Sequence, residues 1–161
     1  MSQQNPSQVI PAPTNLRLKV GASRLGSIDA AAIAKAEAAL KSLSGNFSQW
    51  LQDEITKLEA ARQNVKAQGV SVETMENLSL RAHDLKGLGT TYGYQLITRI
   101  AGSLCRLIDE KDKRLTASMA LIDAHIDAIK AAVREGMKAD DHPIGGALVA
   151  ELERRVKAAG C

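Results

Sequence analysis

Residues 81–89 read RAHDLKGLG, and apolar residues recur at intervals of three and four in this stretch and before it. Such spacing is typical of an α-helix that buries one face. The positions on this face are Met75, Leu78, Ala82, Leu85 and Gly89. At roughly 100° per residue, His83 points about 120° away from the centre of the face. We therefore expect the imidazole of His83 to lie on the exposed side of the helix.

Two residues on the next helical turn are suited to phosphoryl chemistry at His83. Lys86 follows the histidine by three positions and Gly87 by four, so both lie beside the imidazole. Lysine offers a mobile positive charge with three donors, which can neutralise a phosphoryl group on the histidine nitrogen. Glycine leaves the surface without a side chain, so the backbone of another protein can come close. The pattern predicts a phosphorylatable histidine on an open helical face.

The sequence after this helix extends the pattern. A turn is predicted at residues 90–93, and a helical stripe then resumes at Ile97, Ile100, Ala101 and Leu104. With its His-x-x-Lys-Gly pattern, Gly93 ten residues after the histidine, and apolar positions at Ile97 and Leu104, the chain resembles the histidine-containing phosphotransfer (HPt) domain. The resemblance covers about residues 44–137. It departs at Tyr94, where a small residue is common, and at Cys105, where an acid is common.

The resemblance implies a fold, a function and a set of partners. Members of this family carry the histidine on the second helix of a four-helix bundle. His83 would accept a phosphoryl group from the aspartate of a response-regulator receiver domain and pass it to another receiver. A hybrid histidine kinase is the expected upstream partner. The receiver brings the Mg²⁺ ion, so this chain is expected to hold no cofactor of its own.

Four residues near His83 are candidates for docking a partner. Gly87 leaves the helix surface without a side chain, and Leu80 lies one turn before His83, nearly opposite the buried stripe. Leu80 either belongs to an apolar docking patch or is an ordinary exposed leucine. Asp84 is expected to be a solvated carboxylate at the edge of this surface. Thr90 either donates a hydrogen bond to a docked partner or simply occupies a helix end.

Composition predicts the fold class. A chain of 161 residues with 45% hydrophobic content can bury one core, which favours a single main domain. Only 2% of the residues are aromatic, and alanine and leucine dominate the apolar set, which favours closely packed helices over strands. We therefore predict an all-α fold, an up-down-up-down four-helix bundle with an additional N-terminal helix and a C-terminal helix.

Element boundaries follow from caps and breakers. Residues 1–27, rich in proline and polar residues, are predicted to form a flexible arm before a helical domain at residues 28–160, whose core bundle spans about 44–137. One helix is expected from Ser27 to near Gly45 and a second over 47–69.

The second half of the domain is predicted in the same way. Ser71 is the expected cap of the helix that carries His83, and residues 111–114 are expected to form a charged turn. An apolar stripe at 115–137 predicts a further helix. The last helix begins at Pro143, with an apolar face made of Ile144, Leu148, Leu152 and Val156.

Several functions are disfavoured. The net charge of +3 comes from basic residues scattered among acids, which argues against nucleic-acid binding. No stretch is apolar enough to span a membrane and the N-terminus lacks a signal-peptide pattern, so we expect a cytoplasmic protein. Neither the two cysteines nor His125 and His142 have metal-ligand spacing, so no metal site is predicted. His125, flanked by acids, is expected on a solvated flank, and His142 at a helix start.

Two other functional classes remain open. The first is an HPt-like adaptor that binds and sequesters a receiver or kinase without phosphotransfer. The second is a dimerisation and phosphoacceptor fragment of a histidine kinase, whose usual pattern continues with threonine or asparagine and then proline. That pattern is absent, because Leu88 and no proline follows Asp84, and one chain supplies enough helices for a monomeric bundle. The chain has no G-x-x-x-x-G-K-[ST] loop, so we expect a phosphohistidine carrier and no ATP-dependent kinase activity.

Overall fold

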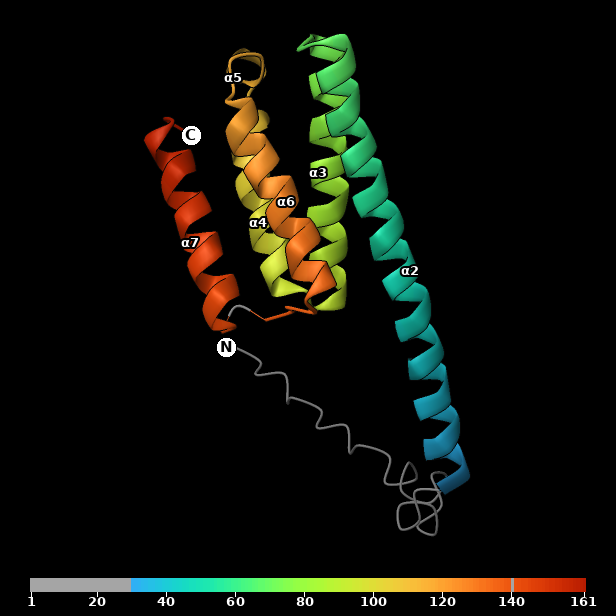
Figure 1. The fold of residues 1–161 in the computed structure, drawn as a ribbon. Helices are drawn as coiled ribbons and strands as arrows, with labels where there is room; N and C mark the ends of the chain where they lie inside the picture. Colours follow the sequence, from blue (N-terminus) through green and yellow to red (C-terminus); the bar gives the residue numbers. More distant parts are fainter. Residues whose placement is uncertain (1–29, 140) are drawn as a thin grey trace, which may run out of the picture. The chain divides into compact units, whose positions relative to one another are not determined.

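A computed structural model describes residues 30–139 and 141–161. The described residues form helices and no strands, which confirms the all-α prediction (Figure 1). The helices are α2 (Ala30–Gln68), α3 (Val72–Tyr92), α4 (Gln95–Ile108), α5 (Lys111–Arg114), α6 (Met119–Arg134) and α7 (Pro143–Ala158). The predicted arm at 1–27 and the Ser27 cap lie outside the described residues. Within the described ranges, no helix is both long and apolar enough to cross a membrane.

The chain divides into two compact units, residues 1–43 and 44–161. The described part of the first unit, residues 30–43, is helical and exposed throughout. The prediction of two helices separated near Gly45 is wrong, because α2 runs without interruption for 39 residues. A glycine in a helix costs only about 1 kcal/mol relative to alanine. The alanine-rich sequence before Gly45 and the helix-favouring residues after it offset this cost.

The core of the second unit is built around α4, which contacts α3, α6 and α7 (Figure 1). α2 contributes one buried stripe to the same core, made of Phe47, Leu51, Ile55, Leu58, Ala61 and Val65. All six positions are spaced by three or four residues, as expected for a helix that buries one face. The helical bundle of the prediction is therefore present, whereas its up-down-up-down order stays a prediction.

The helix that carries His83 has well-defined ends. Ser71 caps α3: its hydroxyl accepts a hydrogen bond from the Thr74 backbone N–H, and the Thr74 hydroxyl accepts one from the Ser71 N–H. This reciprocal pair satisfies two of the free N–H groups at the helix start. At the other end, Gly93 adopts a left-handed conformation (φ 74°), which glycine reaches without strain. The predicted start at Ser71 is confirmed, whereas the helix continues to Tyr92, through most of the turn predicted at residues 90–93.

Two elements differ from the prediction in detail. The expected charged turn at 111–114 is a single helical turn, α5, and its last residue, Arg114, is buried. The last helix begins at Pro143 as predicted, but Ile144 is exposed. Gly145 is buried in its place, because the Leu96 side chain lies where a β-carbon at position 145 would sit. Leu152 and Val156 are buried as predicted, whereas Gly145 and Val149 are buried at the start of α7, where Ile144 and Leu148 were predicted.

The prediction of a solvated His125 is wrong, because this side chain is completely buried in α6. Its Nδ1 lies 2.7 Å from the Leu121 carbonyl oxygen and its Nε2 lies 3.0 Å from the Ser103 hydroxyl. A carbonyl only accepts, so Nδ1–H donates to Leu121, and Nε2 accepts from Ser103. The acids beside His125 in the sequence lie on other faces of α6, so their presence does not show that His125 is exposed to solvent.

The burial of His125 should make stability depend on pH. Burial lowers the pKa of His125 below the usual 6.5, the Leu121 contact opposes this, and the charge of Arg106 adds to it. Below pH 6.5 the unfolded chain then binds more protons than the folded chain, so the free energy of unfolding should fall by up to about 1.4 kcal/mol per pH unit. Denaturant titrations between pH 7.5 and 5 should show this loss. An equal loss in a folded His125→Gln variant would contradict the assignment to His125.

Candidate functional site

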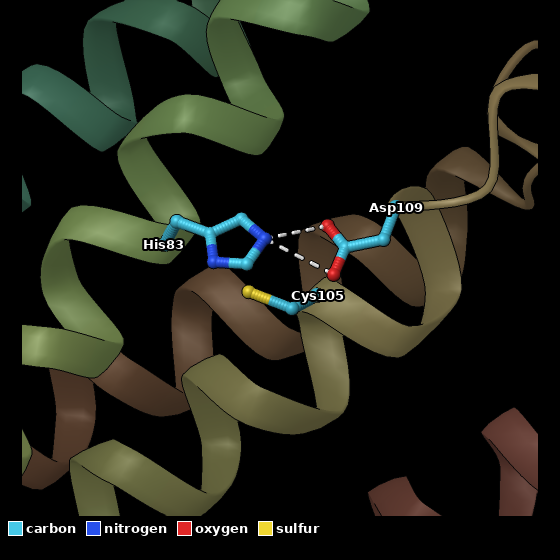
Figure 2. Close-up of side chains that lie close together, drawn as sticks. All are labelled: His83, Cys105 and Asp109. Carbon is cyan, nitrogen blue, oxygen red and sulfur yellow. Dashed lines mark hydrogen bonds and ion pairs between the residues drawn. The ribbon is translucent and has the colours of Figure 1, made fainter.

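His83 lies on the exposed side of α3, as predicted. All five positions of the predicted stripe are buried, whereas the side chain of His83 is 51% exposed. Its Nε2 lies 3.0 and 3.1 Å from the two carboxylate oxygens of Asp109, the residue that ends α4 (Figure 2). The imidazole therefore lies across the groove between α3 and α4, oriented by one carboxylate.

Asp109 is itself held in place by neighbours. The Ser79 hydroxyl, one turn before His83, donates to Asp109 Oδ1 at 3.2 Å. The buried guanidinium of Arg114 donates to the main-chain carbonyl oxygens of Ile108 at 2.7 Å and of Asp109 at 3.1 Å. These carbonyls end α4 and have no partner within their own helix, so Arg114 caps the helix where Asp109 sits. The short helix α5 thus holds the main chain at Asp109, from which the carboxylate reaches His83.

The contact with Asp109 determines which nitrogen of a neutral His83 holds the proton. An ionised carboxylate only accepts hydrogen bonds, so Nε2 carries the hydrogen and donates it to Asp109. The lone pair then lies on Nδ1. When His83 is protonated, both nitrogens donate and neither can attack an electrophile. Asp109 therefore fixes both the orientation of the ring and the tautomer of the neutral side chain.

Lys86 and Gly87 lie on the exposed surface of α3 next to His83, as predicted from their spacing. The aliphatic part of Lys86 passes over Gly102 of α4, where a β-carbon would lie 3.8 Å from Cε and 3.9 Å from Cδ. The ammonium forms no ion pair within the described part of the chain. A β-carbon at Gly87 would meet no atom within 4 Å, so the surface above this position is open.

The three other predicted docking residues also lie on the exposed side of α3. Leu80 is 53% exposed and borders a shallow depression of about 440 Å³ that also includes His83, Asp109 and Arg114. The Asp84 carboxylate pairs with Arg81 at 3.4 Å. The Thr90 hydroxyl donates to the Lys86 carbonyl at 3.0 Å, within its own helix. Leu80 thus faces the depression, whereas Asp84 and Thr90 have partners within α3.

Cys105 adds a thiol to the site from below the imidazole (Figure 2). One donor atom each from His83, Cys105 and Asp109 lie within 4.8 Å of one another. Burial raises the pKa of the Cys105 thiol to about 11, and the Asp109 carboxylate adds to this rise, whereas the charges of Lys86 and Arg106 oppose it. At neutral pH the thiol is therefore protonated.

The sequence did not indicate Asp109, Arg114 or the position of Cys105 beside His83. These residues follow the histidine by more than twenty positions and approach it only when α3 and α4 pack together. A partial signal exists, because Cys105 and Asp109 are four residues apart and so share one face of α4. That spacing does not say which surface of α3 the face meets.

A protein-family model matches most of the chain. The Hpt domain matches residues 42–156 of the chain. Neither the curated proteins nor the solved structures searched for similarity gave a match. The family match includes all of α3, α4, α5 and α6 and most of α2 and α7. The chain therefore belongs to the Hpt domain family, whose members act in phosphotransfer within phosphorelays.

Proposed function

We propose that this protein accepts a phosphoryl group from a receiver aspartate on His83 and passes it to another receiver. The observation that carries the proposal is the exposed imidazole of His83, oriented by Asp109, beside the open surface at Gly87. A receiver domain that docks over α3 reaches the imidazole without displacing any core side chain. The upstream donor is a hybrid histidine kinase, and the protein acts in the cytoplasm.

The transfer step needs little from this chain beyond a placed nucleophile. A neutral ring nitrogen of His83 attacks the phosphorus of the aspartyl phosphate. The nitrogen–phosphorus bond forms as the bond to the aspartyl oxygen breaks, and the receiver carboxylate leaves with the electron pair. Such transfers depend mainly on alignment and on stabilising the charge of the phosphoryl oxygens. The receiver supplies Mg²⁺ for this purpose, so the chain needs no cofactor of its own.

Asp109 serves as a positioning residue in this proposal. Before transfer its carboxylate holds the imidazole and leaves a lone pair on Nδ1. A phosphoryl group on Nε2 would instead meet the carboxylate, and two negative groups so close repel one another. Phosphorylation at Nε2 therefore requires Asp109 to turn away from the ring. Its exposure, 39% for the side chain, leaves room for that rotation.

The docking surface extends from His83 toward α5. Leu80 and the depression at His83 lie next to a second depression, lined in part by the exposed side chains of Val72 and Leu115. The two depressions share Glu76 and Arg114. An apolar area with a polar border is suited to binding a protein partner. Gly87, Asp84 and Thr90 border the other side of His83, so the partner surrounds the histidine.

The function can be tested with one receiver and a mass measurement. The purified chain is incubated with a phosphorylated receiver and Mg²⁺, and its intact mass is measured before and after acid treatment. The proposal requires the addition of a single phosphoryl group that acid removes. If several receivers bind without transferring phosphate, the protein is an adaptor. The solution mass of the same sample tests the proposed monomeric state.

Lys86→Ala should slow transfer without abolishing it. The lysine contributes charge neutralisation and does not form the new bond, and the receiver supplies further positive charge. We expect a rate reduction of roughly 10-fold, about 1.4 kcal/mol of transition-state stabilisation. Single-turnover transfer from a phosphorylated receiver measures this. Lys86→Arg is the matched variant and should retain most of the rate. An unchanged rate in Lys86→Ala would remove the lysine from the mechanism.

A further inference from the structure

His83 lies beside two other side chains that can bind a metal ion, Cys105 and Asp109. His83 projects from α3, and Cys105 and Asp109 project toward it from one face of α4 (Figure 2). One donor atom from each residue lies within 4.8 Å of the other two. The phosphotransfer step uses the imidazole and its contact with Asp109, but it gives no role to the thiol. The placement of Cys105 beside a reactive histidine therefore calls for a separate explanation.

The donor set selects a class of metal. A thiolate, an imidazole and a carboxylate together suit Zn²⁺, whereas Mg²⁺ and Ca²⁺ prefer oxygen ligands alone. Three protein ligands leave the fourth tetrahedral position for water. The binding of a divalent cation to Cys105 and Asp109 would also neutralise the two negative charges that come together when the thiol loses its proton.

The His83 and Asp109 donors are spaced close to those of a zinc site, and the Cys105 sulfur lies within 4.8 Å of both. Two ligands at about 2.1 Å from a tetrahedral zinc ion lie roughly 3.4 Å apart. His83 Nε2 and Asp109 Oδ1 are already 3.0 Å apart. Both of these side chains are partly exposed and can turn, whereas Cys105 is fixed in the core at 2% exposure. Small rotations of His83 and Asp109 toward the fixed sulfur would complete the site.

Hydrogen bonds orient Asp109, as they commonly orient the ligands of a metal ion. The Ser79 hydroxyl donates to its Oδ1, and Arg114 holds its main-chain carbonyl. Such contacts orient a ligand before the metal arrives and strengthen binding. Lys86 and Arg106 are the positive charges that act on Cys105. Both side chains are exposed and can extend into solvent when a cation binds.

We propose that His83, Cys105 and Asp109 form a zinc site, and that bound Zn²⁺ blocks phosphorylation of His83. The first half stands on the geometry alone, and the second half rests on the proposed phosphotransfer function. Binding releases the Cys105 proton to solvent and replaces it with a metal–sulfur bond. Zn²⁺ takes the lone pair of His83 Nε2, so the proton of the neutral ring moves to Nδ1, and neither ring nitrogen keeps a lone pair for phosphorus.

Metal binding can be measured without any phosphotransfer. Zn²⁺ affinity is determined by competition with a chromophoric chelator, and Co²⁺ is used as a spectroscopic substitute that reports a metal–thiolate bond. We expect one ion per chain, with affinity reduced at least about 10-fold in Cys105→Ser, His83→Gln and Asp109→Asn. The matched control is Cys161→Ser, which removes the other thiol and should bind normally. Circular dichroism checks that each variant is folded, and Cys105→Ala replaces Cys105→Ser if the latter unfolds.

Two outcomes would overturn the site. One is equal Zn²⁺ affinity in the wild-type protein and in Cys105→Ser. The other is loss of the cobalt–thiolate absorption in Cys161→Ser, which would place the metal at the chain terminus.

The inhibitory half is tested by phosphotransfer from a receiver with and without Zn²⁺, each variant being compared with its own metal-free rate. Inhibition of the wild-type protein that is lost in a Cys105 variant supports competition at His83. Equal inhibition of both proteins would mean that Zn²⁺ acts on the receiver, which would overturn this half. If the wild-type chain binds Zn²⁺ but accepts no phosphate even without metal, the proposed function fails and the metal site stands.

Discussion

His83→Gln is expected to abolish acid-labile phosphorylation while leaving the fold intact. Glutamine has no nitrogen lone pair that can attack phosphorus, because the amide nitrogen is delocalised into the carbonyl. The side chain of His83 is 51% exposed and contributes nothing to the buried core. Its contact with Asp109 is a partly exposed pair, which contributes about 0–1 kcal/mol to stability. The free energy of unfolding should therefore change by less than about 1 kcal/mol.

The matched control for this experiment is His142→Gln. His142 caps α7, where its Nδ1 accepts a hydrogen bond from the Gly145 N–H, and it lies on another helix from the proposed site. This variant should accept phosphate normally, with a stability loss of about 1 kcal/mol or less from the weakened cap. Intact mass spectrometry after incubation with a phosphorylated receiver measures both variants. Acid-labile phosphate on His83→Gln, or global unfolding of that variant, would contradict the expectation.

Local sequence signals predicted most of the helical bundle. The apolar stripe of α3, the Ser71 cap and the turn at Gly93 were each recognisable from a few neighbouring residues, and all three are confirmed. The break near Gly45 was predicted by the same kind of signal and is wrong. A glycine weakens a helix by a small amount, which the surrounding residues can offset. A cap or breaker therefore indicates a boundary only where the neighbouring residues do not favour continuing the helix.

The sequence predicted the site residues that lie on α3, but it did not predict those contributed by other helices. The exposure of His83, Lys86 and Gly87 followed from helical periodicity, and the structure agrees. Asp109 and Arg114 reach the site only through the packing of α4 and α5 against α3. His125 shows the same limit in the core, since the pairing of its Nε2 with Ser103 joins α6 to α4. Periodicity gives the direction of a side chain within a helix, but it does not identify the helix that the side chain meets.

Gly89→Ala should destabilise the protein, whereas Gly87→Ala, two residues earlier on the same helix, should stabilise it. Gly89 is buried where α3 meets the start of α4. A β-carbon there would lie 2.6 Å from the Thr98 hydroxyl oxygen, 3.1 Å from the Thr98 backbone nitrogen and 3.3 Å from the Tyr94 carbonyl oxygen. Thr98 can rotate its hydroxyl, but the two backbone atoms move only if α3 and α4 separate. Overpacking of this kind costs about 1–3 kcal/mol.

Gly87→Ala isolates the effect of helix propensity, because a β-carbon at position 87 meets no atom within 4 Å. Replacing glycine by alanine inside a helix gains roughly 0.5–1 kcal/mol when nothing obstructs the methyl group. The free energies of unfolding should therefore change in opposite directions in the two variants, as measured by denaturant titration with linear extrapolation. If Gly89→Ala were also stabilising, the close approach of α3 and α4 at this position would be wrong. The buried stripe of α3, which sets the outward direction of His83, would then lack the contact of Gly89 with α4.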